Sequence, residues 1–63
     1  MGDKGKIMDI GKFVRVISDA SYKHYKKIGR ITKFCKNPDM IYVYFSGDKH
    51  AIRFYKSSLE LLN

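Results

Sequence analysis

The chain has 63 residues, of which 44% are hydrophobic and 30% are charged. A chain of this length forms one small domain with a thin core, and this composition is typical of a folded globular protein. Thirteen Lys and Arg residues against six Asp and Glu residues give a formal net charge of +7. The single cysteine excludes an internal disulfide and a cysteine-based zinc site. No apolar run approaches about 18 residues and no signal-peptide pattern is present, so we expect a cytoplasmic monomer without membrane contact.

The first segment, residues 1–6, contains two glycines and charged side chains and is expected to be a flexible tail. The domain is therefore predicted to span residues 7–63. Residues 10–18 combine dense β-branched residues with an alternation of apolar and polar side chains, which predicts a strand. Within it, Val14 and Val16 are expected to face the core.

A loop and a second strand are predicted next. Residues 19–27 lack both the strand alternation and the apolar stripe that would dock a helix, which favours an ordered loop. Residues 28–34 read as a second strand, with Gly29 near its start. A glycine there is expected to permit a β-bulge, a positive φ or a close approach of the backbone. The sequence KNPD at residues 36–39 predicts a turn.

The second half of the chain contains three more predicted strands. Residues 40–46, MIYVYFS, alternate most clearly, and the Gly-Asp pair at 47–48 predicts a hairpin turn. Residues 51–55 form the returning strand. Residues 56–58 are expected to form a 3₁₀ turn, and residues 59–62 close the chain as a short strand.

Five short strands without a long helix predict an all-β fold, a small five-stranded antiparallel SH3-like barrel. An open meander of this size would expose one apolar face, and closing it covers that face and removes the edges. The alternation predicts a core of ten side chains: Val14, Val16, Ile31, Ile41, Val43, Phe45, Ile52, Phe54, Leu59 and Leu61.

The residues also resemble a known family. GKFVRVIS, then a basic loop, then KKIGRITKF is similar to a KOW motif, which is a strand, a loop and a second strand with one fixed glycine, here Gly29. The remainder, VYFSGDKHAIRFYKSSLELL, resembles the second half of small SH3-like barrels that carry this motif. In those barrels a short turn and a terminal L-E-L strand follow the last hairpin. The resemblance covers residues 10–62.

The resemblance implies binding rather than catalysis. KOW-type domains occur in ribosomal proteins and transcription elongation factors, where they contact RNA, DNA or polymerase. Similar barrels serve as protein-docking subunits, such as a small peripheral subunit of photosystem I and the ferredoxin-docking subunit of the photosynthetic NDH complex. The first loop of this chain is longer and more basic than the G-x-x-K-G loop common in the family, and the fold alone does not choose between these roles.

The positive charge is concentrated in one segment. Between residues 20 and 38 there are six cations and no acid: Lys23, Lys26, Lys27, Arg30, Lys33 and Lys36. Such a cluster indicates a polyanionic ligand. Nucleic acid is favoured, an acidic protein surface is the second interpretation, and a solvated loop that keeps the chain soluble is the third. Tyr22 and Tyr25 lie within the same segment and strengthen the first.

The strand faces that point away from the core carry alternating arginine and tyrosine. The alternation places Arg15, Tyr42, Tyr44, Arg53 and Tyr55 outward. Tyrosine rings and arginine planes can stack on exposed bases while lysines meet phosphates. Outward tyrosines are also good strand formers and cross-strand partners without any ligand.

Metal and catalytic chemistry have no support in the pattern. His24 and His50 lack partners at ligand spacing, so no metal or cofactor is predicted. His24 is interpreted as a stacking or phosphate contact and His50 as a turn-flanking residue. Cys35 is expected to be a buried or half-buried structural thiol, since no base accompanies it. No carboxylate pair or Ser-His-Asp arrangement appears, so we predict that the chain is not an enzyme.

The sequence therefore predicts a small basic module that binds RNA or another nucleic acid in a ribosome- or transcription-associated role. The six clustered cations, together with Arg15, Arg53, Tyr22, Tyr25, Tyr42 and Tyr44, are the expected binding residues. The alternative is a docking module that presents its basic face to an acidic partner protein of a larger complex.

Overall fold

A computed structural model describes residues 8–19 and 23–62 of the chain. The tail expected at residues 1–6 and the predicted binding residue Tyr22 lie outside the described residues. The described elements are five strands and one 3₁₀ turn: β1 (Phe13–Val16), β2 (Ile28–Phe34), β3 (Met40–Tyr44), β4 (Ile52–Tyr55), η3 (Lys56–Ser58) and β5 (Leu59–Leu61).

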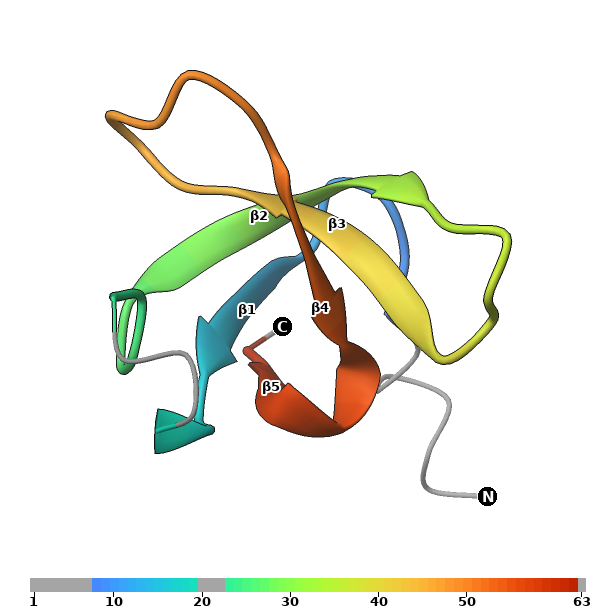
Figure 1. The fold of residues 1–63 in the computed structure, drawn as a ribbon, viewed down its shortest axis with the longest axis horizontal. Coiled ribbons are helices and arrows are strands. Elements are labelled where there is room, and N and C mark those ends of the chain that lie inside the picture. The colour runs from blue at the N-terminus through green and yellow to red at the C-terminus, as the bar shows by residue number, and fades with distance from the viewer. Residues whose placement is uncertain (1–7, 20–22, 63) are drawn as a thin grey trace.

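The strands form one antiparallel sheet in the order β4-β3-β2-β1-β5. The predicted all-β fold of five antiparallel strands is confirmed, and the predicted closure is not: β4 and β5 are the two edges of the described sheet. The sheet stays open because η3 turns the chain from β4 towards β1 (Figure 1). The Ile17 amide donates to the Ser58 carbonyl at 2.8 Å, so β5 pairs with β1 instead of β4.

Strand β1 is shorter than the predicted strand over residues 10–18. Gly11 has a φ of +93° and its amide donates to the Ile31 carbonyl at 2.8 Å, while the Ile31 amide donates to the Lys12 carbonyl at 2.9 Å. Two residues thus oppose one, which is a β-bulge with glycine in the left-handed position. The regular ladder therefore begins only at Phe13.

The turn after β3 also differs from a tight hairpin. The Asp48 amide donates to the Phe45 carbonyl at 3.1 Å, and Gly47 has a φ of +96°. Glycine at this third turn position supplies the positive φ that a type II turn needs. The predicted turn is present, but β4 begins only at Ile52, so the connection is longer than a two-residue hairpin.

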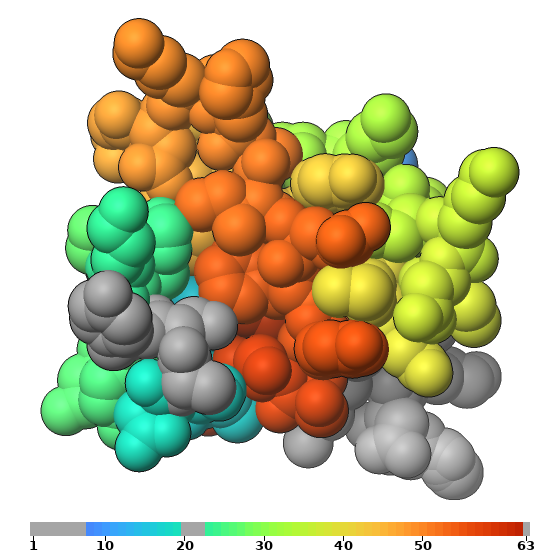
Figure 2. Space-filling model, viewed as in Figure 1, coloured from blue at the N-terminus to red at the C-terminus, as the bar shows by residue number. Residues whose placement is uncertain are grey.

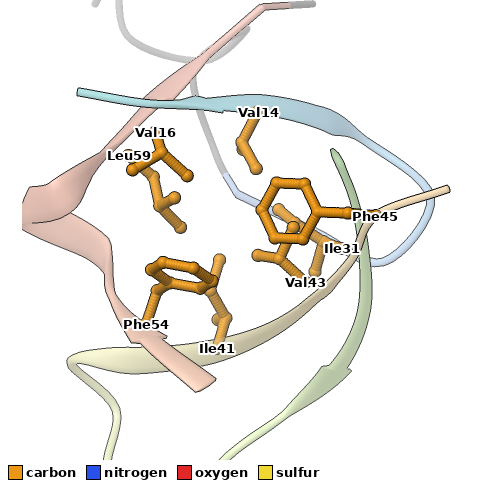
Figure 3. Close-up of a cluster of buried hydrophobic side chains, with 8 residues drawn as sticks. All are labelled: Val14, Val16, Ile31, Ile41, Val43, Phe45, Phe54 and Leu59. Carbon is orange, nitrogen blue, oxygen red and sulfur yellow. The ribbon is translucent and has the colours of Figure 1, made fainter. Parts of the chain in front are cut away.

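The core lies on the inner face of the curled sheet. Figure 3 shows eight buried side chains that converge between the strands: Val14, Val16, Ile31, Ile41, Val43, Phe45, Phe54 and Leu59. The alternation predicts all eight. The other two expected members, Ile52 and Leu61, are partly buried and pack against the core, as does Met8, which the alternation does not predict. The strand register is therefore confirmed, with the tyrosines and arginines of the strands on the outer face.

Gly29 acts through close packing. Its φ is not positive, and the sheet irregularity lies between Ile31 and Lys33, so the expected positive φ and bulge at Gly29 are wrong. The third expectation, a close approach of the backbone, is confirmed: β2 lies close to β3 at Gly29. A Cβ at Gly29 would lie 2.5 Å from Val43 Cγ1 and 2.8 Å from the Tyr44 carbonyl oxygen. No side chain fits there without moving β2 away from β3.

Gly29→Ala is therefore expected to lower the free energy of unfolding by about 1–3 kcal/mol, the usual cost of overpacking. Urea denaturation measures this loss. In a Val43→Ala background the same substitution should cost less, because one of the two colliding groups is gone. Equal penalties in both backgrounds would contradict the close-contact explanation.

Two phenylalanines offer a matched test of the core. Phe45 is 3% exposed and Phe34 is 49% exposed. Phe45→Ala should lower the unfolding free energy by about 3–5 kcal/mol, because it leaves a cavity. Phe34→Ala should change it by less than about 1 kcal/mol. Thermal or urea unfolding distinguishes them, and similar losses would mean that the core is assigned wrongly.

Candidate functional site

Two rows of side chains cross the outer face of the sheet, the face opposite the core. The first row runs from β1 to β3 and pairs Phe13 with Arg30 and Arg30 with Tyr44. The second row runs from β2 to β4 and pairs Lys33 with Tyr42 and Tyr42 with Arg53. Directly opposed side chains in a sheet have Cβ atoms about 4.5–5.5 Å apart. Each row therefore alternates aromatic and cationic groups at contact distance.

Cations and rings touch within these rows. The guanidinium carbon of Arg30 lies 5.1 Å from the centre of the Phe13 ring. The ammonium of Lys33 lies 5.6 Å from the centre of the Tyr42 ring. At exposed positions such contacts contribute about 0.5–1 kcal/mol each, which orients a side chain without removing its charge from solvent.

The second row depends on an irregularity in β2. The register between β2 and β3 shifts between Ile31 and Lys33, so Thr32 is an extra residue and Lys33 opposes Tyr42. Without this bulge Thr32 would take that place and the cation would be lost from the row. The sequence IGRITKF gives no signal for the bulge, because its glycine lies elsewhere.

The arginines of the outer face differ in their surroundings. Arg15 lies opposite Glu60 on β5, and Nη1 is 3.3 Å from Glu60 Oε1. The two side chains are 43% and 50% exposed, so this pair adds little stability, but it places an acid beside one predicted binding residue. Among the described residues, Arg30 and Arg53 form no ion pair. The arginines of the outer face that form no ion pair among the described residues therefore lie on β2 and β4.

The β1–β2 loop holds the predicted residues Lys23, Tyr25, Lys26 and Lys27, all of them exposed. Lys26 has a φ of +69°, and its amide donates to the Val16 carbonyl at 2.9 Å. The Val16 amide in turn donates to the Lys27 carbonyl at 3.0 Å. This is the bulge pattern of Gly11 and Lys12 repeated at the other end of the β1–β2 ladder, with lysine where glycine is usual.

His24 belongs to the packing rather than to the exposed surface. Its side chain is 15% exposed, and Nε2 donates a hydrogen bond to Asp48 Oδ2 at 3.0 Å. Its ring lies 4.5 Å from the Phe45 ring and 6.0 Å from the Phe54 ring, between centres. The interpretation of His24 as a base or phosphate contact is therefore wrong. It fixes the β1–β2 loop (green) to the β3–β4 loop (orange), and these lie against each other in Figure 2.

Lys36 lies beyond the opposite end of β2 from the β1–β2 loop. A hollow of about 500 Å³ joins it to the second row, with Lys33, Tyr42 and Arg53 in the same lining. Cys35, also in this lining, is half-buried, in keeping with the expected structural thiol. Apart from Arg15, which pairs with Glu60, the predicted residues that the structure describes fall into three groups: the first row, the second row with Lys36, and the β1–β2 loop.

No described helix is long and apolar enough to cross a membrane. Within residues 8–19 and 23–62, no three His, Cys, Asp or Glu side chains gather closely enough to hold a metal ion. A scan against protein-family models, a search of curated proteins and a search of solved structures each found no match to this chain.

The left-handed position of Lys26 gives a test of the loop. Lys26→Gly should raise the free energy of unfolding by about 1 kcal/mol, since glycine adopts a positive φ without strain. Lys27→Gly removes the same charge where φ is not positive, and it should lower stability by up to about 1 kcal/mol. Chemical denaturation of both variants measures the difference. Changes of the same sign and size would show that lost charge, not backbone strain, is responsible.

Proposed function

We propose that this chain is an SH3-like barrel of KOW type that binds single-stranded RNA on the outer face of its sheet. The observation that carries the proposal is the pair of cross-strand rows, in which rings alternate with cations. Phe13 and Tyr44 of the first row are exposed, and Tyr42 of the second row is half-buried. Proteins that bind single strands combine a positive surface for the phosphates with rings on which bases stack. The chain binds its ligand and does not transform it, and it needs no cofactor.

The fold supports the SH3-like part of the proposal. The short turn η3 joins β4 to the terminal strand β5, as in the barrels that the sequence resembles. Strand β5 pairs with β1. The terminal strand is L-E-L, Leu59–Leu61. The two edge strands face one core, because Phe54 of β4 and Leu59 of β5 are members of the same buried cluster.

The arrangement suits single strands better than a duplex. Bases inside a duplex are stacked on each other and hide the faces that tyrosine rings would contact. Specific duplex recognition usually places a helix or a β-ribbon in the major groove, and the described part of the chain contains one 3₁₀ turn of three residues and no longer helix. Unpaired nucleotides of an RNA loop or end are therefore the proposed ligand.

Each kind of side chain has its own expected contribution. Arg53, Lys33 and the loop cations Lys23 and Lys27 would meet phosphates, a contact that positions a strand without selecting its sequence. Tyr42 and Tyr44 would stack on bases. An acidic protein surface, the second interpretation of the charge, would use the cations but would not need the ring faces.

A salt titration tests the proposal with a fluorescently labelled single-stranded oligoribonucleotide of mixed sequence. Lys33→Gln with Arg53→Gln should flatten the plot of log affinity against log salt by about 1.4, because each lost phosphate contact contributes about 0.7. Tyr42→Leu should weaken binding by about 1–3 kcal/mol with an unchanged slope, because it removes stacking and not charge.

Lys56→Gln is the matched control, because Lys56 lies in η3 outside both rows. It should leave the affinity close to that of the parent protein. No binding by the parent protein at low salt would reject the proposal and favour an acidic protein partner. Binding that responds to the cations but not to Tyr42→Leu or Tyr44→Leu would reject the role of the rings.

A further inference from the structure

The residues of the first row line a hollow on the outer face. It has a volume of about 430 Å³, and the side chains that line it are Phe13, Ile28, Arg30, Thr32, Tyr44 and Ser46. The lining thus combines two aromatic rings, one aliphatic group and two aliphatic hydroxyl groups with one cation and no acid. Phe13 and Tyr44 are 38% and 39% exposed, so part of each ring remains available to a ligand.

Arg30 supplies the positive charge of this hollow, and its surroundings suit a planar ligand. Its guanidinium lies over the Phe13 ring at 5.1 Å. It has no ion-pair partner among the described residues, in contrast to Arg15, which is paired with Glu60. A guanidinium next to a ring keeps the N–H donors that point away from the ring free for a second partner. On the other side, Arg30 directly opposes Tyr44.

We propose that this hollow binds one unpaired guanine base of the RNA ligand, an inference that rests on the proposed function. The base stacks on the exposed Tyr44 ring, and its O6 and N7 accept two hydrogen bonds from the guanidinium edge of Arg30. Guanine is the base that presents two neighbouring acceptors, O6 and N7, on its major-groove edge. Adenine presents an acceptor beside a donor on the same edge. The hydroxyl groups of Thr32 and Ser46 lie in the same lining and can accept hydrogen bonds from the remaining donors of guanine.

The test uses three labelled oligouridylates that carry one central guanine, adenine or 7-deazaguanine. The parent protein should bind the guanine probe about 5- to 150-fold more tightly than the adenine probe, the range of a bidentate arginine–guanine contact. The 7-deazaguanine probe lacks the N7 acceptor and should lose most of this advantage.

Arg30→Lys keeps the charge and removes the planar fork. It should abolish the preference for guanine while the salt dependence of binding stays as in the parent protein. Arg53→Lys, the same substitution in the second row, should retain the preference. Equal unfolding midpoints for both variants establish that each is folded.

The outcomes separate the two proposals. Binding of all three probes with equal affinity would overturn the guanine site and leave the RNA-binding surface in place. A guanine preference that survives Arg30→Lys would also overturn it, because the contact would then lie elsewhere. Failure of the parent protein to bind any probe at low salt would instead reject the proposed function itself.

Discussion

The contact between β2 and β3 at Gly29 determines the rest of the structure. A Cβ at this position would lie 2.5 Å from Val43 Cγ1 and 3.0 Å from Phe45 Cδ2, so the two strands can lie this close only because the side chain is missing. The contact brings the backbone of β2 down onto two core residues. It also fixes the register in which the next residue, Arg30, lies between Phe13 and Tyr44. The same close approach thus completes the core and assembles the first row.

The alternation of side chains along β2 gives its inner and outer faces different roles. Its inward positions, Gly29 and Ile31, belong to the buried interior, and its outward positions carry Arg30 and Lys33. The extra residue Thr32 keeps the second cation on the outer face. Because β2 is the middle strand of five, its cations have ring-bearing neighbours on β1 and β3. A stable core and a cationic, aromatic surface therefore arise from the same strand without conflict.

The alternation of apolar and polar residues is enough to predict the core and the outer face. In β3, for example, Ile41 and Val43 are fully buried while Tyr44 is exposed, as a period of two requires. The bulge at Thr32 and the contact of His24 with Asp48 could not be predicted. The first depends on how β2 fits β3, and the second joins residues 24 positions apart in the chain. The open edge between β4 and β5 escapes prediction for a similar reason, because η3 is bonded to Ile17 and Asp39, which lie far from it in the sequence.

We propose the outer face of β1, β2, β3 and β4 as the binding surface. The most direct measurement is a titration of the ¹⁵N-labelled protein with a short single-stranded oligoribonucleotide at low salt, followed by two-dimensional ¹H–¹⁵N NMR. We expect the largest shift changes at residues of the two rows, with Arg30, Lys33 and Tyr42 among them, and little change in η3. Changes confined to η3 and β5, or spectra that do not change at all, would contradict this proposal.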